Sequence, residues 1–178
     1  MRFEPVTIRT DRLVLRPYRL EDAPRLHALI DNWNIARMLT RVPHPYPAEL
    51  AASWIATHDA ERAAGQSHFA MEADGELVGA TGLHVEDTGD IETGYWIGEP
   101  YWGKGYATEG ARAMLEYGFA QLRLEQITAG HFVDNPASGR VLTKCGFRYT
   151  GTGQRFSLAR DAQVDCREMI VRRQDIGF

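Results

Sequence analysis

Two glycines bracket a lysine at the junction between an expected strand and an expected helix. The segment reads Tyr101-Trp102-Gly103-Lys104-Gly105-Tyr106-Ala107-Thr108-Glu109. Glycine has no Cβ, so the backbone at Gly103 and Gly105 can approach a ligand closely. The first N–H groups of the following helix have no partner within the helix, and the helix dipole makes this end positive. The spacing therefore favours binding of an anion such as a pyrophosphate, with an ordinary glycine-rich turn as the alternative.

Residues that often bind metals or act as nucleophiles form no recognisable motif in this sequence. The two cysteines, Cys145 and Cys166, lack a C-x-x-C spacing, and we expect both to be small buried side chains. Nothing near Cys145 in the sequence activates a thiol. The six histidines include no H-x-x-x-H pair. The sequence therefore predicts no metal site and no disulfide framework.

Before the glycine corner, the chain alternates between helical and strand-like periodicity. The switch to period two after Gly65, with Asp74-Gly75 as a tight turn, predicts a β-hairpin. The elements expected before the corner are a strand at residues 8–16, a short helix at 20–30, a helical piece at 33–39, a helix at 48–64, hairpin strands at 69–73 and 77–83, and a strand at 91–97.

After the corner, one apolar face predicts an amphipathic helix. Its members are Ala107, Ala111, Met114, Leu115, Gly118, Phe119 and Leu122. Asn135 followed by Pro136 predicts the N-cap and first position of a second helix, which is expected to end at Gly146. Further strands are expected at residues 126–133, 147–156 and 163–172.

This order of elements predicts an α/β (α+β) fold. Strands joined by a tight turn are antiparallel, whereas a strand-helix-strand unit around the corner requires parallel neighbours. We therefore expect a mixed, largely antiparallel twisted sheet, with parallel strands at the corner and helices on both faces. No repeat or linker interrupts residues 1–178, so we expect a single domain.

Composition narrows the class of protein. The 178 residues are 44% hydrophobic and 25% charged, as in ordinary globular proteins. A formal net charge of -4 gives no reason to expect a nucleic-acid partner. No apolar run approaches the roughly 20 residues that cross a bilayer, and the N-terminus lacks the apolar core of a signal peptide. We expect a cytoplasmic protein without a membrane partner, either a monomer or a homodimer.

Four motifs together carry a family resemblance. They are Thr10-Asp11-Arg12-Leu13-x-Leu15-Arg16, Glu92-x-Gly94-Tyr95-Trp96, Trp102-Gly103-Lys104-Gly105-Tyr106-Ala107, and Asn135-x-x-Ser138-x-Arg140-Val141-Leu142-x-Lys144-x-Gly146-Phe147. The third resembles the acyl-CoA pyrophosphate loop of the GNAT N-acetyltransferase superfamily, Arg/Gln-x-x-Gly-x-Gly/Ala. The set spans nearly the whole chain and is similar to the RimJ/RimL branch, the ribosomal-protein N-acetyltransferases. A GNAT fold is the resulting expectation.

The sequence departs from the family pattern at two positions. Trp102 stands where many members have Arg or Gln, although the RimJ/RimL branch is similar to this sequence there. Leu142 occupies the helix position where many members place a tyrosine that protonates the leaving thiolate. The general acid of the family is therefore not carried over to this chain.

The resemblance implies how acetyl-CoA binds. Backbone amides of Gly103, Lys104, Gly105, Tyr106 and Ala107 are expected to hold the pyrophosphate. The main chain of Trp96, Ile97 and Gly98 is expected to pair with pantetheine like an added strand. Asn135 is expected to cap its helix and bond to the pantetheine arm. For Lys104, a solvated side chain whose backbone alone matters is the alternative.

Acetyl transfer to an amine also requires proton transfers. Alternation places Glu92 on one face of the strand that leads to the donor site, and we identify it as the candidate base. A solvent-facing glutamate is the alternative. Ser138 lies one turn into its helix, and its hydroxyl is the candidate proton donor to the thiolate or a group that polarises a water there. The alternative is a small residue that lets the cofactor approach.

The function predicted from the resemblance is transfer of an acetyl group from acetyl-CoA to a primary amine by direct attack, without a metal. A protein N-terminal α-amine is the expected acceptor. A small-molecule amine, such as an amino acid, polyamine or antibiotic, is the alternative. A non-catalytic acyl-CoA-binding domain is a rival from another class. A nucleotide-binding module is a weaker one, because Gly103-Lys104-Gly105 fits neither G-x-G-x-x-G nor the P-loop.

Overall fold

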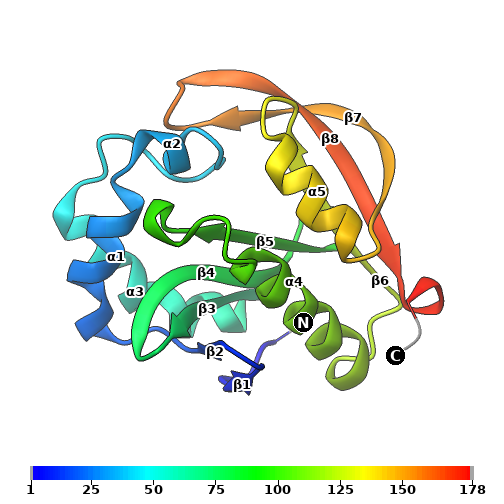
Figure 1. Cartoon of the computed structure of the whole chain (residues 1–178), viewed down its shortest axis with the longest axis horizontal. Helices are drawn as coiled ribbons and strands as arrows, with labels where there is room; N and C mark the ends of the chain where they lie inside the picture. Colours follow the sequence, from blue (N-terminus) through cyan, green and yellow to red (C-terminus); the bar gives the residue numbers. More distant parts are fainter. Residues whose placement is uncertain (1, 177–178) are drawn as a thin grey trace.

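An eight-stranded sheet runs through the computed structural model, which describes residues 2–176 (Figure 1). Its strand order is β1-β2-β3-β4-β5-β6-β8-β7. The strands are β1 (Ile8–Arg9), β2 (Val14–Arg16), β3 (Gln66–Ala73), β4 (Glu76–Val85), β5 (Ile91–Ile97), β6 (Gln126–Phe132), β7 (Arg148–Ser157) and β8 (Ala162–Arg172). The predicted mixed sheet is confirmed.

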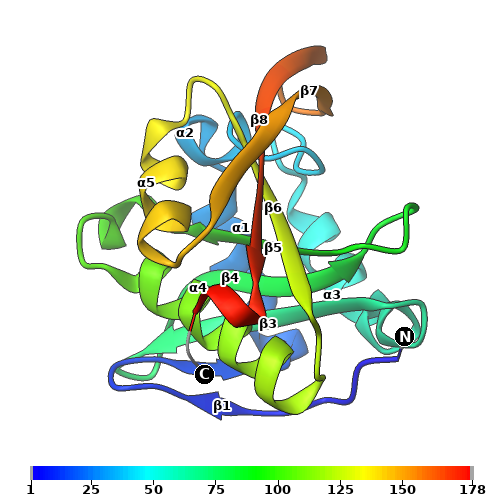
Figure 2. The ribbon, with the colours of Figure 1, turned by 90° about the vertical axis from the view of Figure 1, so that its right-hand side faces the viewer.

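Helices cover both faces of this sheet (Figures 1 and 2). They are α1 (Ala23–Ile30), α2 (Trp33–Ala36), α3 (Ala48–Ala63), α4 (Tyr106–Glu116) and α5 (Pro136–Lys144). One apolar core lies between the sheet and α4 and α5, and a second lies between the sheet and α1 and α3. Among residues 2–176, no helix is both long and apolar enough to span a bilayer.

The parallel pairing occurs at a single place among the described strands. Every neighbouring pair is antiparallel except β5 and β6, which α4 connects. β5 pairs with β4 along its whole length, but its register with β6 contains only Glu92 opposite Thr128. Beyond this point β5 and β6 diverge, and Figure 2 shows β6 running steeply across the direction of β5. A gap in the sheet hydrogen bonding therefore opens beside the C-terminal half of β5.

Local sequence signals explain several elements directly. Asp74 and Gly75 both have positive φ, 51° and 80°, as a two-residue turn between antiparallel strands requires. Ala111, Met114 and Leu115 are buried against the sheet, so the predicted apolar face of α4 is confirmed. At the end of α5, Gly146 has φ 91° and the Phe147 N–H donates to the Leu142 carbonyl (3.1 Å), which is a Schellman arrangement.

Two predicted elements differ from the structure. Residues 8–16, expected to form one strand, form the β1–β2 hairpin, because the Thr10 N–H donates to the Leu13 carbonyl (2.9 Å) and closes a turn. The helical piece expected at residues 33–39 is only the four-residue α2. After it, Leu39 N–H donates to Ala36 in a tighter i to i+3 turn. In both places the predicted type of element is present, but its extent was wrong.

The end of the α4 helix also differs from a regular continuation. Residues Tyr117–Gln121 form a π-helical turn, in which the Leu122 N–H donates to the Tyr117 carbonyl (3.1 Å). Gly118 lies so close to β6 that a Cβ would be 2.7 Å from Ile127 Cδ1. The wider turn therefore accompanies a close approach between the chain after α4 and the strand that follows.

Candidate active site

The glycine corner forms an exposed N-terminus for α4. Gly105 is the N-cap residue in the left-handed conformation (φ 83°), and Gly103 has φ 77°. No side chain caps this end of the helix, so the amides of Tyr106 and Ala107 have no capping acceptor. A Cβ on Gly103 would meet nothing within 4 Å. The corner therefore presents backbone N–H groups in open space, the arrangement that suits a diphosphate.

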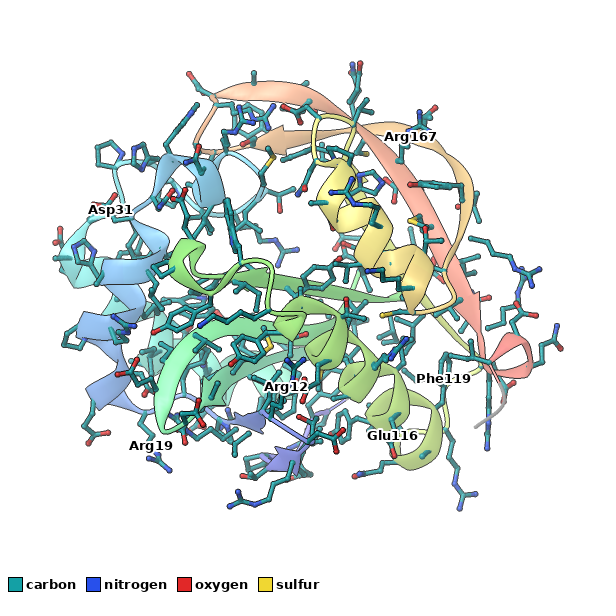
Figure 3. All side chains as sticks on the ribbon, in the orientation of Figure 1. Arg12, Arg19, Asp31, Glu116, Phe119 and Arg167 are labelled. Carbon is teal, nitrogen blue, oxygen red and sulfur yellow. The ribbon has the colours of Figure 1, made fainter. Side chains whose placement is uncertain are left out.

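Arg12 supports this corner from the β1–β2 turn (Figure 3). Its guanidinium donates to the Lys104 carbonyl (2.8 Å) and to the Glu109 carboxylate (2.7 Å), and it lies over the Tyr106 ring. Burial raises the pKa of Glu109, but hydrogen bonds from Thr10 and Arg12 outweigh this effect and leave the pKa below its usual value. Arg12 therefore neutralises a carboxylate that would otherwise repel an anion at this helix end.

The side chains of the corner have partners of their own. Lys104 Nζ lies 5.2 Å from the centre of the Tyr101 ring. Trp102, half exposed, donates from Nε1 to the Ile97 carbonyl (2.7 Å). The aromatic residues thus fix the loop to the end of β5, and what remains free for a ligand is mainly backbone.

The open edge of β5 follows from its pairing with β4. The Gly98 N–H donates to the Val78 carbonyl (2.8 Å), whereas the Ile91 carbonyl accepts from Thr128 Oγ1 on β6 (3.1 Å). Because backbone direction alternates along a strand, Tyr95 and Ile97 direct their N–H and C=O groups toward β6. β6 has diverged at this point, so these groups border the gap.

A hydroxyl pair bridges β5 and α5 on the face covered by α4 and α5. Asn135 caps α5, with its side chain accepting from the Ser138 N–H (3.2 Å), which confirms the predicted cap. Ser138 Oγ is 2.9 Å from the Tyr95 hydroxyl. Burial raises the pKa of Tyr95 above its usual value, so its hydroxyl stays protonated. The alternation of side chains along β5 places Tyr95 on the face opposite Glu92, but no functional role was predicted for Tyr95.

Glu92 lies on the opposite face of β5, in an ion-pair network. Arg155 Nη1 and Nη2 donate to the two Glu92 oxygens at 2.6 and 2.8 Å, and Arg155 also binds Glu168 (2.6 Å). The hydrogen bond to Glu92 is the largest cause of a raised pKa for Arg155. Arg155 crosses β6 at Gly130, where a Cβ would lie 2.8 Å from the guanidinium. No sequence signal linked Arg155 to Glu92.

Glu92 and Ser138, the two predicted catalytic residues, therefore lie on the two faces of the sheet. The gap between β5 and β6 lies between them. A reactant entering from the α1 and α3 face would meet Glu92, and one bound along the α4 and α5 face would meet Ser138.

Cys145 is placed for packing. It is buried in the core beside α4, and burial raises the pKa of its thiol to about 11. A thiol with this pKa is almost entirely protonated at neutral pH and is a poor nucleophile. Cys166 is likewise a buried free thiol with a pKa raised to about 11 by burial.

Comparisons with known proteins agree with this geometry. The N-acetyltransferase YoaA of Bacillus subtilis is 32% identical over 163 residues, 89% of this chain and 92% of the relative. Spermidine N(1)-acetyltransferase of Escherichia coli is 29% identical over 142 residues, 77% of this chain and 73% of that one. The coenzyme A complex of RimL, a ribosomal L7/L12 α-N-protein acetyltransferase, shares the fold with a TM-score of 0.81 at 18% identity, covering 94% and 98% of the two chains.

The family model of the GNAT acetyltransferase domain matches residues 12–148, from the β1–β2 turn to the start of β7. This range includes the glycine corner, the gap between β5 and β6, and the capped N-terminus of α5. The chain therefore belongs to the GNAT family of acetyltransferases.

Proposed function

We propose that this protein transfers an acetyl group from acetyl-CoA to a primary amine by direct attack. The observation that carries the proposal is the gap beside β5, which has an anion-binding corner at one end and separate polar groups on its two faces. Polar groups on opposite faces of β5 suit a thioester and an amine that approach each other from opposite sides, without a covalent enzyme intermediate.

The proposed donor site uses mostly backbone groups. The amides of Gly103 to Ala107 hold the diphosphate of acetyl-CoA, and Arg12 keeps the corner in shape. Pantetheine lies along β5, where the backbone groups of Tyr95 and the N–H of Ile97 face the gap and Trp96 lies between them. The Ile97 carbonyl already accepts from Trp102 Nε1 (2.7 Å). The Gly98 amide is already bound to Val78, so its predicted contact passes to Ile97 in this proposal. Asn135 lies at the end of α5 that borders the same gap.

The proposed proton donor to the departing thiolate is Ser138, whose hydroxyl then regains a proton from water. Tyr95 supports it, because the two hydroxyls are 2.9 Å apart and Tyr95 stays protonated. A hydroxyl chain of this kind can deliver a hydrogen bond to a sulfur in place of the tyrosine that Leu142 replaces. Ser138 would contact the reacting atoms, and Tyr95 acts through it.

Glu92 is proposed to attract and orient the amine on the other face. Its carboxylate is largely buried and is fixed by two hydrogen bonds from Arg155. Both carboxylate oxygens are held by Arg155, which favours an orienting role. Under this proposal the amine proton leaves to water. That Glu92 itself accepts the proton stays a prediction. The pH profile of turnover distinguishes this role from orienting the amine.

We propose a protein N-terminal α-amine as the first acceptor, as named for the RimL structure that shares this fold. A polyamine is the second, because the relative named spermidine N(1)-acetyltransferase matches 77% of this chain. The test is to incubate the enzyme with isotopically labelled acetyl-CoA and, separately, peptides with free N-termini, the same peptides N-terminally blocked, and spermidine. Label on free but not blocked peptides supports the first acceptor. Label on spermidine alone favours the second, and label on no amine contradicts acetyl transfer to both.

A further inference from the structure

A cluster of imidazoles lies between α3 and the strands β3 and β4. Figure 1 shows α3 on the face of the sheet opposite α4, the helix that the glycine corner precedes. His58 and Glu61 are one turn apart on α3, so their side chains face the same way. His68 extends from β3 toward them. One ligand atom from each of these three residues lies within 4.8 Å of the other two.

The carboxylate of the cluster is already oriented. Glu61 Oε2 is 2.7 Å from His68 Nε2, and Glu61 Oε1 accepts from Thr57 Oγ1 (2.7 Å). Metal ligands in proteins are commonly held in this way by a second polar group behind them. Thr57 is therefore a support for the carboxylate.

The imidazole nitrogens of His58 have no hydrogen-bond partner among residues 2–176. His58 is only 4% exposed, and both Nδ1 and Nε2 are buried. Tyr18 and Trp54 pack edge-on against its ring, and neither makes a hydrogen bond to its nitrogens. Buried polar atoms in folded proteins nearly always have a partner. Two bare nitrogens beside a carboxylate and another imidazole point to a bound species.

His84 on β4 lies beside the cluster. Its ring centre is 5.0 Å from that of His68, and its buried Nδ1 also lacks a partner among the described residues. His68 pairs with Gly82, and His84 follows two residues later on the same face of β4. The cluster therefore offers nitrogen atoms from three elements.

Two cations, Arg41 and Arg62, lie close enough to His68 to repel a bound metal ion. Arg62 is neutralised in part by an ion pair with Asp59, and Arg41 by Glu86.

We propose that His58, Glu61 and His68 bind a divalent transition-metal ion, best matched by Zn²⁺, with His84 as the fourth ligand. Nitrogen and carboxylate ligands are those that Zn²⁺ takes, and tetrahedral bonds of about 2.0–2.1 Å put ligand atoms about 3.3 Å apart. The three ligand atoms, now within 4.8 Å of one another, would move closer together when the ion binds. The ion would tie α3 to β3 and β4, and the proposal is independent of acetyl transfer.

The sequence expectation of no metal rested on the missing H-x-x-x-H pair. The H-x-x-x-H motif takes two histidine ligands from one helix. Here α3 supplies His58 and Glu61, three residues apart, and β3 and β4 supply the other histidines. Spacing within the sequence does not show this arrangement, because α3 and β4 meet only through the tertiary fold.

The test uses the full chain, stripped with a chelator and titrated with Zn²⁺ and, separately, with Co²⁺. We expect one ion per chain by calorimetry and metal analysis, a visible d–d spectrum typical of a four-coordinate Co²⁺ site, and a higher thermal midpoint on Zn²⁺ addition. Absence of stoichiometric binding, or an octahedral Co²⁺ spectrum like that of the free ion, would overturn the proposal.

Variants separate the site from adventitious binding. Glu61→Gln keeps the shape of the side chain but removes the charged ligand, so the variant should fold. A change behind a metal ligand lowers metal affinity by roughly 10- to 100-fold, and loss of the ligand itself should lower Zn²⁺ affinity by more than that. Thr57→Val is such a change behind the ligand and should lose about 10-fold. His27→Gln, which alters a histidine on α1 with an unpartnered Nδ1 outside the cluster, should leave affinity unchanged. Equal losses in Glu61→Gln and His27→Gln, or no loss in Glu61→Gln, would contradict the assignment.

Discussion

The bidentate contact between Glu92 and Arg155 decides how this carboxylate can act. Replacing Glu92 by Gln keeps its size but removes the charge. If Glu92 orients the amine, the KM for the amine should rise roughly 10- to 150-fold, since a charge-assisted hydrogen bond contributes about 1.5–3 kcal/mol. The shape of the pH profile should persist. Steady-state kinetics between pH 6 and 10 measure both quantities.

A base role for Glu92 predicts a different result. The kcat would then fall by about 10²- to 10⁴-fold, and the limb of the pH profile that reports the base would disappear. Glu168→Gln is the matched control, because Glu168 also binds Arg155 and its loss loosens the same guanidinium. Equal kinetic effects of the Glu92 and Glu168 variants would show that both act only by holding Arg155.

Ser138 is open to a direct test, because its backbone N–H, not its side chain, makes the α5 cap contact with Asn135. Ser138→Ala should therefore fold normally. We expect kcat to fall by about 10²-fold, at the low end for loss of a general acid, with the KM for acetyl-CoA nearly unchanged. Full turnover in this variant would mean that Ser138 is only a small residue beside the donor.

Tyr95→Phe probes the second hydroxyl. If Tyr95 acts through Ser138, its loss should lower kcat less than Ser138→Ala, and the double variant should be no slower than Ser138→Ala alone. Independent, additive losses would assign Tyr95 a separate role. Protein folding is checked in each case by the thermal midpoint.

At the scale of the element, the corner before α4 depends on two left-handed glycines. Gly105→Ala forces a Cβ into φ 83°, which costs about 1–2 kcal/mol, and places it 3.3 Å from Arg12 Nη2. We expect a lower thermal midpoint and a KM for acetyl-CoA raised about 10-fold, because the amides that bind the diphosphate shift.

Gly75→Ala is the control for that strain. Gly75 has a similar φ of 80° and open space around its Cβ position, but it lies in the β3–β4 turn. It should lower stability by a similar amount and leave the KM for acetyl-CoA unchanged. Similar KM changes in both variants would mean that the Gly105 effect is general destabilisation.

The elements that the sequence predicted well are those with strong local signals. The Asp74-Gly75 turn and the Asn135-Pro136 cap need particular residue types, and both were found as expected. The β1–β2 hairpin was not predicted, because its turn is closed by a Thr10 to Leu13 contact rather than by glycine or asparagine.

Within the candidate site, the sequence identifies the segment that offers backbone groups but not the side-chain contacts between distant residues. The glycine corner lies within one continuous segment, so its residues were identifiable. The Glu92–Arg155 pair joins residues 63 positions apart, and the Tyr95–Ser138 pair joins residues 43 apart. Such contacts depend on how β5 and β6 diverge, which no periodicity encodes. The histidine cluster escaped prediction for the same reason.

At the scale of the whole molecule, a largely buried ion-pair cluster joins distant parts of the first half of the sheet. Arg16 on β2 donates to both oxygens of Asp22 (2.8 and 2.9 Å) and to Glu72 on β3 (2.8 Å). Asp22 also accepts from the Arg19 N–H just before α1. The cluster thus links two strands and the start of a helix, and its loss should be felt in unfolding of the entire chain if residues 1–178 are one domain.

Asp22 makes this link sensitive to acid. Burial raises its pKa, but hydrogen bonds from Arg16 and Arg19 outweigh burial and leave the pKa below its usual value. As the pH falls, Asp22 is therefore protonated in the unfolded state before it is protonated in the folded state. Its stabilisation is fully present above the ordinary aspartate pKa of about 3.9, and it is lost as the pH falls through the lower pKa of the folded state. Asp22→Asn should lower the free energy of unfolding by roughly 1.5–3 kcal/mol at pH 7, with the difference from the native chain shrinking toward pH 3.

Urea unfolding followed by circular dichroism and by tryptophan fluorescence measures this difference, and coincident transitions would support a single domain. Asp74→Asn, at an exposed turn position, is the control and should not change the pH dependence. A pH-independent difference between Asp22→Asn and the native chain would show that the carboxylate charge is not what stabilises the cluster.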